Sequence, residues 1–447
     1  MQEKEQLLRV LGLAFGVAAV VGAVVGQGIL RSPGEIAQAS GSPALIISLW
    51  IGGGLVALVS AFAFAELGTS IPRAGGIFAY IYRAIGPRAG LFGAFALIFA
   101  YLSTNAVLAF VTGEYLVRLG VGGGEVSAVA LGIGVTALFA LLNAMGTRAT
   151  GGSQIVFSAL KGAALVALVI ALFASPGGTV QPAVEVPLLR NGWLPMATAM
   201  LLVISTYNGW SDLVFYGEEI TDPARQIPRA LFGGIIGVSA LYILVNLAML
   251  HVMTPDQMAG SDLVAADAAG MVLGERGDFA LTLFGVLSVG AIGNLGLMTN
   301  TRMVFAAARA GILPKFLSIV DRRGTPMGAM LFSSVAASAL ILTGSYNSLQ
   351  SMSVTAFQLT ITMGVLSALA LRRREPDLPR PFKIPFYPWP VIFAAVLNAA
   401  LIVVFVVQDP WYSLIGMIAI TALWAFYAFV LKRVGTLETT ESPGITS

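Results

Sequence analysis

Residues 22–33 read GAVVGQGILRSP, and they interrupt the first long apolar segment at a depth where a membrane helix would have to be continuous. Three glycines, Gly22, Gly26 and Gly28, lower the cost of leaving helical geometry there. We therefore predict two half-helices separated by a break in mid-membrane.

Such a break leaves backbone groups without intrahelical partners on both sides. The carbonyls of Val24 and Val25 would end the upstream half-helix, and the amides of Gln27, Gly28 and Ile29 would begin the downstream one. Carbonyls attract a cation, whereas amides at the positive end of a helix dipole attract an anion. A free amino acid carries both charges on one carbon, so it matches the break.

The composition is that of a polytopic membrane protein. Of 447 residues 57% are hydrophobic and 11% are charged, with a mean hydropathy of +0.87. The isoelectric point of about 9.1 reflects loop charges that orient the chain, and we do not expect a nucleic-acid partner. Without cysteine and with one histidine, the chain offers neither a disulfide framework nor a thiolate metal site, and we expect no cofactor.

A span of roughly 20 apolar residues crosses a bilayer. On this basis the chain contains twelve candidates, at about residues 9–31, 43–68, 89–118, 126–146, 150–174, 194–219, 229–253, 278–307, 326–344, 350–371, 388–407 and 411–431. With the N-terminus inside, twenty of the 25 lysines and arginines fall on the cytoplasmic side, four fall outside, and Lys161 lies within a span. The positive-inside rule therefore predicts an inner-membrane protein with both termini in the cytoplasm.

The sixth span is also interrupted. Its centre reads STYNGWSDLVFYGEEITDP, with Asn208, Gly209 and Asp212 well short of a full crossing. Two breaks five spans apart predict an inverted repeat of five plus five helices with a site between the breaks. We expect an all-α fold with repeats at residues 1–174 and 194–371, two extra helices at 388–431, and a cytoplasmic tail at 432–447.

Five motifs in register carry a resemblance to the amino acid–polyamine–organocation superfamily, nearest to its L-amino acid transporter branch. They are GQGILRSPGEIA from Gly26, AELGTSIPRAGGIFAYIY from Ala65, Lys161, YNGWSDLVFYGEEITDPARQIPRAL from Tyr207, and RMVFAAARAGILPKFLS from Arg302. The resemblance implies a scaffold of spans 3, 4, 8 and 9, and a moving bundle of spans 1, 2, 6 and 7. Its disulfide-linked branch needs a cysteine, so we expect a monomer or homo-oligomer.

The resemblance also implies the substrate contacts. The carboxylate would bind the backbone of Gln27, Gly28 and Ile29, and the ammonium would bind carbonyls at Val24 and at residues 205–208. The full set of predicted binding residues is Val24, Val25, Gly26, Gln27, Gly28, Ile29, Ser205, Thr206, Tyr207, Asn208, Gly209 and Trp210. This chain has Gln27 where relatives often have serine or threonine, and Ser205 at the position of an aromatic gate.

Lys161 lies near the centre of the fifth span, too deep for its ammonium to reach an interface. In relatives without sodium coupling, a lysine at this position resembles a replacement for a sodium ion that bridges spans one and eight. We predict that Lys161 bonds carbonyls near Gly22 and Ala23; reaching an internal water file, or carrying a proton, are the alternatives.

Four further residues keep two interpretations each. Trp210 either covers the pocket or anchors the second half of the sixth span. Asp212 is expected to cap amides, with contact to a cationic substrate as the alternative. Glu218 and Glu219 form either an interfacial charge cluster or an inner gate with Arg9, Arg73 or Arg83.

The function that these features predict is sodium-independent transport of neutral L-amino acids by alternating access, as an exchanger or a uniporter. Neutral substrates are favoured because the first break contains no acid. The rivals are a cationic amino acid or polyamine antiporter, a proton-coupled symporter and a non-transporting amino acid sensor. An enzyme is not expected, because the one available pair of a serine and a base, Ser158 and Lys161, lies three residues apart on one helix and no second motif supports it.

Overall fold

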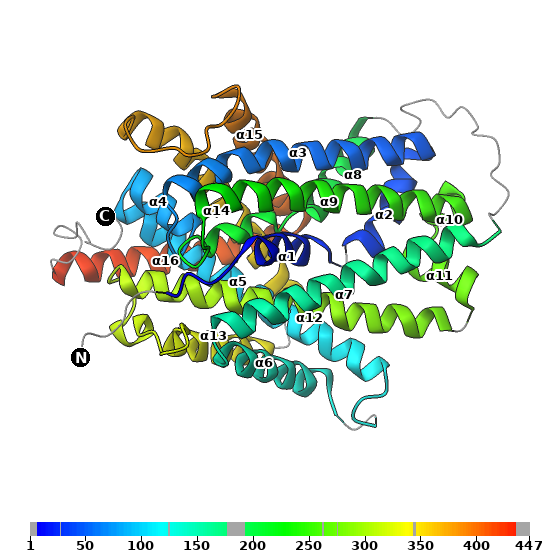
Figure 1. Ribbon diagram of the computed structural model, residues 1–447, viewed down its shortest axis with the longest axis horizontal. Helices are drawn as coiled ribbons and strands as arrows, with labels where there is room; N and C mark the ends of the chain where they lie inside the picture. Colours follow the sequence, from blue (N-terminus) through cyan, green and yellow to red (C-terminus); the bar gives the residue numbers. More distant parts are fainter. Residues whose placement is uncertain are drawn as a thin grey trace.

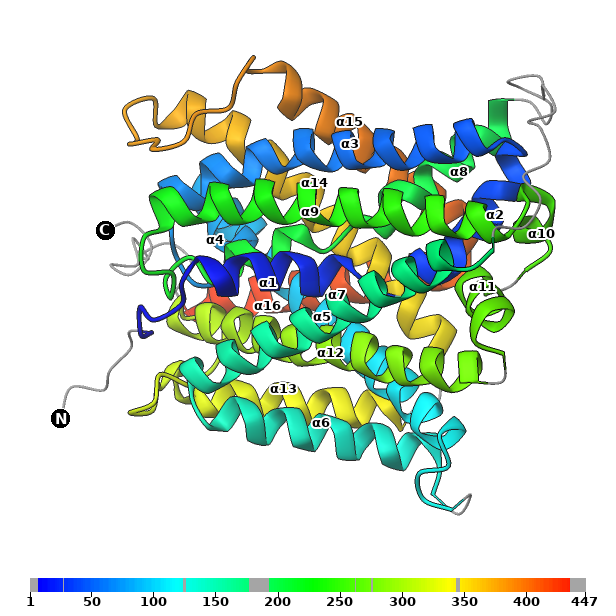
Figure 2. The same cartoon turned by 45° about the vertical axis from the view of Figure 1, so that its right-hand side comes forward.

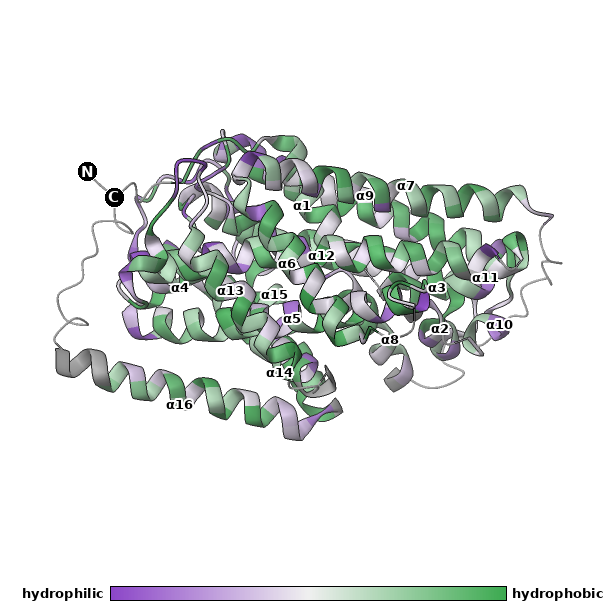
Figure 3. Cartoon of the chain, turned by 90° about the horizontal axis from the view of Figure 1, so that it is seen from below, coloured by the Kyte–Doolittle hydropathy of each residue, from purple (hydrophilic) through white to green (hydrophobic). Residues whose placement is uncertain are grey.

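A computed structural model describes residues 7–26, 28–123, 126–176, 193–261, 263–274, 276–342 and 346–434. Within these residues the long elements are all helices that run roughly parallel to one another (Figure 1). Both ends of the described chain lie on one face (Figure 2). We call it the basic face, because the sequence analysis assigns twenty of the 25 lysines and arginines to the side of the N-terminus. Figure 3 shows the hydrophilic residues gathered towards the ends of the bundle and hydrophobic residues along its length.

Ten continuous helices of the described chain match ten of the predicted spans. They are α3 (Pro43–Ser70), α5 (Pro87–Arg118), α6 (Ala128–Ala144), α7 (Thr147–Ala174), α9 (Pro223–Val252), α12 (Arg276–Arg309), α13 (Met327–Ile341), α14 (Tyr346–Arg374), α15 (Trp389–Gln408) and α16 (Pro410–Val434). Eight of these are long and apolar enough to cross a membrane, and α6 and α13 are shorter apolar helices. Large apolar side chains such as Val335, Val407 and Trp411 are exposed around the bundle, as a lipid environment requires.

The other two predicted spans are broken. The first consists of α1 (Leu13–Val24) and α2 (Gly28–Ser40), so α2 continues through Pro33 and the first span ends later than the expected residue 31. The sixth consists of α8 (Trp193–Thr206) and a short 3-10 helix, η1 (Trp210–Phe215). The expected second half-helix is therefore replaced by six residues with tighter i to i+3 bonding, as in the bond from the Asp212 amide to the Gly209 carbonyl.

Short connecting helices lie on opposite faces in the two halves. Between α3 and α5, α4 (Ile77–Ile85) lies at the basic face. Between α9 and α12, α10 (Pro255–Ala259) and α11 (Val264–Leu273) lie at the opposite face. A second 3-10 helix, η2 (Lys315–Ser318), follows α12.

Helix packing repeats between the halves. The contact of α7 with α9 has its counterpart in α14 with α3, and that of α5 with α6 has its counterpart in α12 with α13. The central pair α5 and α12 links the halves. These paired contacts, together with the reversed connecting helices, are those of an inverted repeat of five plus five helices.

Candidate functional site

The two helix breaks lie directly against each other. Gly209 has φ +112°, and a Cβ atom there would lie 2.8 Å from the Ala23 carbonyl oxygen. Gly28 approaches Thr206 as closely, since its Cβ would lie 2.7 Å from Thr206 Cγ2. Only glycine supplies both the left-handed backbone and the missing side chain at Gly209. The structure thus brings together segments that are 178 to 186 residues apart in the sequence.

The carbonyls that end α1 are held by side-chain donors. Lys161 Nζ donates to the Gly22 carbonyl at 2.8 Å and to the Val25 carbonyl at 2.5 Å, and the lysine is 0% exposed. The predicted contact with Gly22 is confirmed, but the second acceptor is Val25. The carbonyl of Ala23 faces Gly209 instead, because the chain has already left helical geometry at Val25.

Two further donors at this break were missed by sequence reasoning. Tyr242 Oη of α9 donates to the Val24 carbonyl at 2.9 Å, and Ser288 Oγ of α12 donates to the Val25 carbonyl at 3.3 Å. Neither residue belongs to a distinctive motif, so only the packing of α9 and α12 on α1 could reveal them. The end of α1 is therefore tied to α7, α9 and α12 at once.

The opposite side of the first break is the start of α2. Its first-turn amides, beginning at Gly28 and buried Ile29, point back into the break, because a helix leaves its first four N–H groups without helical partners. Gly26 packs against Ile292 of α12, where a Cβ would lie 3.0 Å from Ile292 Cδ1. Gln27, the remaining predicted residue, lies outside the described residues.

At the second break the polar backbone and the large side chains point in different directions. The Ser205 carbonyl accepts a hydrogen bond from the Asn208 amide at 3.1 Å, and Ser205, Thr206 and Asn208 are half-buried. Tyr207 Oη donates to the Trp50 carbonyl of α3 at 3.1 Å. The Trp210 ring meets Phe64 of α3 edge to face with centroids 5.4 Å apart.

Trp210 thus packs away from the first break. It is 5% exposed and forms one wall of a small cavity between α3, α14 and α15, together with Tyr207, Asn208 and Ser211. Of the two interpretations of Trp210, this position matches the anchor of the sixth span.

Asp212 does not cap helix amides with its side chain. The N-cap of η1 is Gly209, which makes no side-chain cap bond. The Asp212 carboxylate instead accepts a hydrogen bond from Tyr101 Oη of α5 at 2.6 Å and is 8% exposed. The capping interpretation is therefore wrong, because the 3-10 geometry and the packing of α5 give the carboxylate a partner from another helix.

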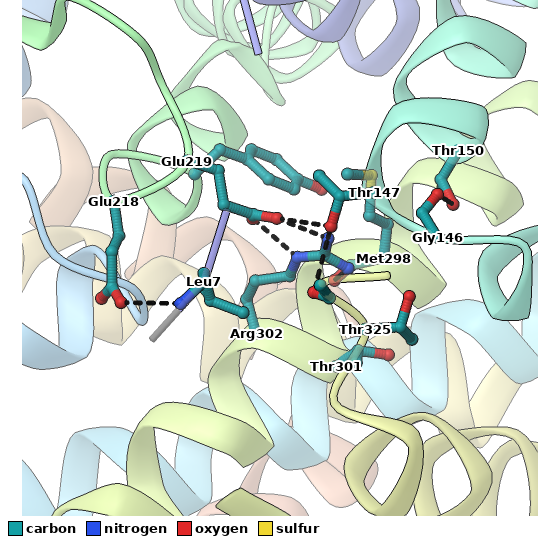
Figure 4. Close-up of polar contacts among 12 residues, drawn as sticks. Leu7, Gly146, Thr147, Thr150, Glu218, Glu219, Met298, Thr301, Arg302 and Thr325 are labelled. Atoms are coloured by element: carbon teal, nitrogen blue, oxygen red, sulfur yellow. Dashed lines mark hydrogen bonds and ion pairs between the residues drawn. The ribbon is translucent and has the colours of Figure 1, made fainter. Parts of the chain in front are cut away.

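The two adjacent acids at the end of the sixth span form separate ion pairs with α12. Glu219 is 0% exposed and is bonded by Arg302 Nε and Nη2, both at 2.8 Å, and by Thr147 Oγ1 at 3.1 Å (Figure 4). Glu218 is bonded by Arg309 Nη1 and Nη2 at 2.8 and 2.7 Å. We call Thr147, Glu218, Glu219, Arg302 and Arg309 the gate cluster.

Among the described residues, none of the three predicted arginines forms an ion pair with Glu218 or Glu219, although Arg73 has a charge interaction with Glu218. Arg83 pairs with Glu375, and both gate arginines come from α12 rather than from the segments that carry Arg9, Arg73 or Arg83. Sequence separation gives no indication of which helix end faces the acids. The interfacial alternative also fails for Glu219, which is fully buried.

Glu218 lies in the loop after η1, outside the membrane-spanning segments. Burial acts to raise the pKa of this carboxyl, but its hydrogen bonds and charge interaction with Arg309 outweigh burial, and backbone amides of Ala74 and Leu7 add to them. The net pKa of Glu218 is lowered, so the carboxylate is the stable form at neutral pH.

The segment before α1 completes the closure of the basic face. The amides of Val10 and Leu11 both donate to the Glu219 carbonyl, at 3.0 and 2.9 Å, and the Thr221 amide donates to the Leu11 carbonyl at 3.0 Å. Leu7 and Leu11 are buried. The two breaks are therefore sealed from the basic face in this conformation.

Buried amides connect the helices behind the first break. Ser158 Oγ donates to the Ala18 carbonyl at 2.7 Å, and Gln154 Nε2 to Ser158 Oγ at 3.3 Å. Asn294 of α12 joins them by donating to Gln154 Oε1 at 3.2 Å. Asn294 therefore links α12 to α7 behind the first break.

Residues 8–425 match the family model described as "Amino acid permease". The chain is 29% identical to the b(0,+)-type amino acid transporter 1 of Mus musculus over 445 residues, which cover 98% of this chain and 91% of that protein. It is 28% identical to the cystine/glutamate transporter of Homo sapiens, over 96% of this chain and 87% of that one. It is also 28% identical to the large neutral amino acids transporter small subunit 2 of Oryctolagus cuniculus, with 87% and 74% covered.

Proposed function

The chain belongs to the amino acid permease family, and we propose that it transports neutral L-amino acids without sodium, by exchange or uniport. Amino acid transport across a membrane, rather than enzymatic chemistry, follows from the family. The observation that carries the finer proposal is the contact of the two breaks, where Gly209 lies against the Ala23 carbonyl.

The zwitterion binds between the breaks. Its carboxylate binds the backbone of Gln27 together with the first-turn amides of α2 at Gly28 and Ile29, where backbone donors and the helix dipole both favour an anion. Its ammonium donates hydrogen bonds to the Val24 carbonyl and to carbonyls of residues 205–208. In the conformation described here the Val24 carbonyl is bonded by Tyr242, so the incoming ammonium exchanges with that hydroxyl.

Lys161 supplies the positive charge that a sodium ion would otherwise bring. Its two bonds join α7 to the end of α1, and Ser288 of α12 shares the Val25 acceptor. A fixed ammonium at this junction of three helices removes the need for a metal cation there. This arrangement supports sodium independence.

Neutral side chains are favoured over cationic ones. A cationic substrate needs an acid that faces the breaks, and Asp212 is the nearest acid in the sequence. Its carboxylate is bonded to Tyr101, whose ring packs between Phe215 and Phe357 at centroid distances of 5.6 and 5.7 Å. This placement gives the cationic alternative no support.

Alternating access follows from the repeat. Residues 1–174 and 194–371 form the two repeats, and the last two helices pack outside them. Because α16 continues to Val434, the tail begins after Val434 and not at the predicted residue 432. The bundle of spans 1, 2, 6 and 7 rocks against the scaffold of spans 3, 4, 8 and 9. In the inner membrane, with both termini cytoplasmic, the gate cluster closes the cytoplasmic face, and the chain works as a monomer or homo-oligomer without a disulfide-linked subunit.

Purified protein in liposomes tests this proposal. Vesicles loaded with unlabelled alanine, leucine or arginine are challenged with the labelled amino acids, in sodium and in choline buffers. We expect equal exchange of alanine and leucine in both buffers, and little exchange of arginine. Exchange of arginine alone, or a strict need for sodium, would overturn the proposal.

A further inference from the structure

Asp212 is a membrane-embedded acid that the proposed substrate site does not use. It lies on η1, three residues beyond the second break, and is 8% exposed. An ionisable side chain at such depth is costly unless it is paired or functional. No lysine or arginine among the described residues forms an ion pair with it.

The groups around Asp212 leave its charge uncompensated. Tyr101 of α5 is hydrogen-bonded to Asp212, and Tyr216 directly follows η1. The ionisable side chains in the middle and inner parts of the helices packed against η1 include Tyr242 of α9, Arg302 and Arg309 of α12 and Glu66 of α3, whereas α1 has none over Leu13–Val24. Both arginines form ion pairs with the glutamates of the gate cluster, and Glu66 forms an ion pair with Arg372. Tyr242 is bonded to the Val24 carbonyl, which leaves the Tyr101 hydroxyl as the direct partner.

The site around this pair fits a proton and not a larger cation. The Tyr101 ring meets Phe215 and Phe357 edge to face, so aromatic rings enclose the hydroxyl that bonds the acid. The neighbouring cavity is lined by Trp210 and Ser211 but not by Asp212. A guanidinium or an ammonium on a substrate side chain would have to displace this aromatic packing.

The hydrogen bond also joins the two parts that move. Asp212 belongs to the sixth span, which is in the bundle, and Tyr101 belongs to the third span, which is in the scaffold. A hydrogen bond to a carboxylate is roughly twice as strong as one between neutral groups. Protonation of Asp212 therefore weakens a contact between bundle and scaffold, and rocking of the bundle changes the surroundings of the acid.

We propose that Asp212 is a proton-binding site that couples amino acid transport to a proton gradient. Hydronium from one face transfers a proton to the carboxylate and leaves water, and on the other face the carboxylic acid returns the proton to water. One proton crosses with each amino acid, and no other reactant is needed. This inference rests on the proposed function and replaces its uniport mode by proton-coupled symport of the neutral amino acid, whereas exchange at equal pH needs no proton gradient.

The experiment uses the full chain in liposomes at a clamped membrane potential. An inward gradient of about one pH unit allows up to about tenfold accumulation of alanine at one proton per substrate. We expect the wild type to accumulate alanine under this gradient. Asp212→Asn is expected to exchange alanine at equal pH and to accumulate none, whereas Glu114→Gln, which removes an exposed acid from α5, should respond like the wild type.

Each other outcome has a defined meaning. Gradient-independent uptake by the wild type, or full gradient response in Asp212→Asn, overturns the proton site. Loss of arginine exchange alone in Asp212→Asn, with no pH response, overturns it in favour of a contact with cationic substrates. If wild type exchanges no neutral amino acid at equal pH, the proposed function fails first.

If Asp212→Asn does not fold, a second variant tests whether Asp212 binds the coupling proton. Tyr101→Phe keeps the acid and removes its hydrogen-bond donor. We expect gradient-driven uptake to persist with a displaced pH midpoint, because the donor stabilises the ionised form. A pH profile identical to that of the wild type would refute the role of Asp212.

Discussion

Replacement of Lys161 by alanine tests how much free energy this lysine contributes to the structure of the first break. The lysine makes two charge-assisted hydrogen bonds, to Gly22 and Val25, and such bonds contribute roughly 1.5–3 kcal/mol each. Val25 keeps Ser288 as a donor, and the variant also removes the cost of burying a charge. We therefore take the stabilisation lost in Lys161→Ala as the lower end of the sum for the two hydrogen bonds, about 3 kcal/mol.

This magnitude predicts a population change. Because about 1.4 kcal/mol corresponds to a factor of ten, Lys161→Ala should shift the equilibrium away from the conformation closed at the basic face by about 100-fold. Ser158→Ala is the matched control, since it removes one neutral hydrogen bond between the same two helices. At about 1 kcal/mol, the control should shift the equilibrium only about fivefold.

The chain lacks cysteine, so one introduced thiol reports opening without background. Ala74 is 2% exposed beside the gate cluster, and its amide donates to Glu218. In Ala74→Cys protein, we expect the alkylation rate to rise strongly with Lys161→Ala and slightly with Ser158→Ala, while alanine exchange falls in the same order. Unchanged alkylation and exchange in Lys161→Ala would refute the reasoning.

Three other outcomes follow from the contacts described. Gly209→Ala should abolish exchange, because a Cβ would lie 2.8 Å from a carbonyl at φ +112°, whereas Gly237→Ala has open space and should leave exchange intact. Glu219→Gln breaks a buried ion pair and should cost roughly 3–5 kcal/mol of stability, seen as a lower unfolding temperature in detergent. Because the pKa of Glu218 is lowered, its pairing with Arg309 should stabilise the fold from about pH 5 to pH 8 and be lost only as pH falls through that lowered pKa; a thermal-stability profile of Glu218→Gln against wild type checks this.

Local sequence was sufficient to predict the helical architecture. The length of each apolar run sets the number of crossings, because a bilayer has a fixed thickness and its core offers no water to the backbone. Glycine at Gly22, Gly26, Gly28 and Gly209 makes interruptions possible at two depths. Their spacing of five spans predicts the inverted repeat. A lysine in mid-span, Lys161, likewise indicated a contact with backbone carbonyls, and it reaches Gly22.

Tertiary structure decided which helices supply the partners. Arg302 and Arg309, rather than the arginines of other loops, bind the gate glutamates, and Tyr101 rather than an amide binds Asp212. The sequence pattern of a helix that is apolar on every side does not show how the helix is rotated about its axis. That rotation is set by packing against neighbours far away in the chain, and it selects which buried polar side chains meet.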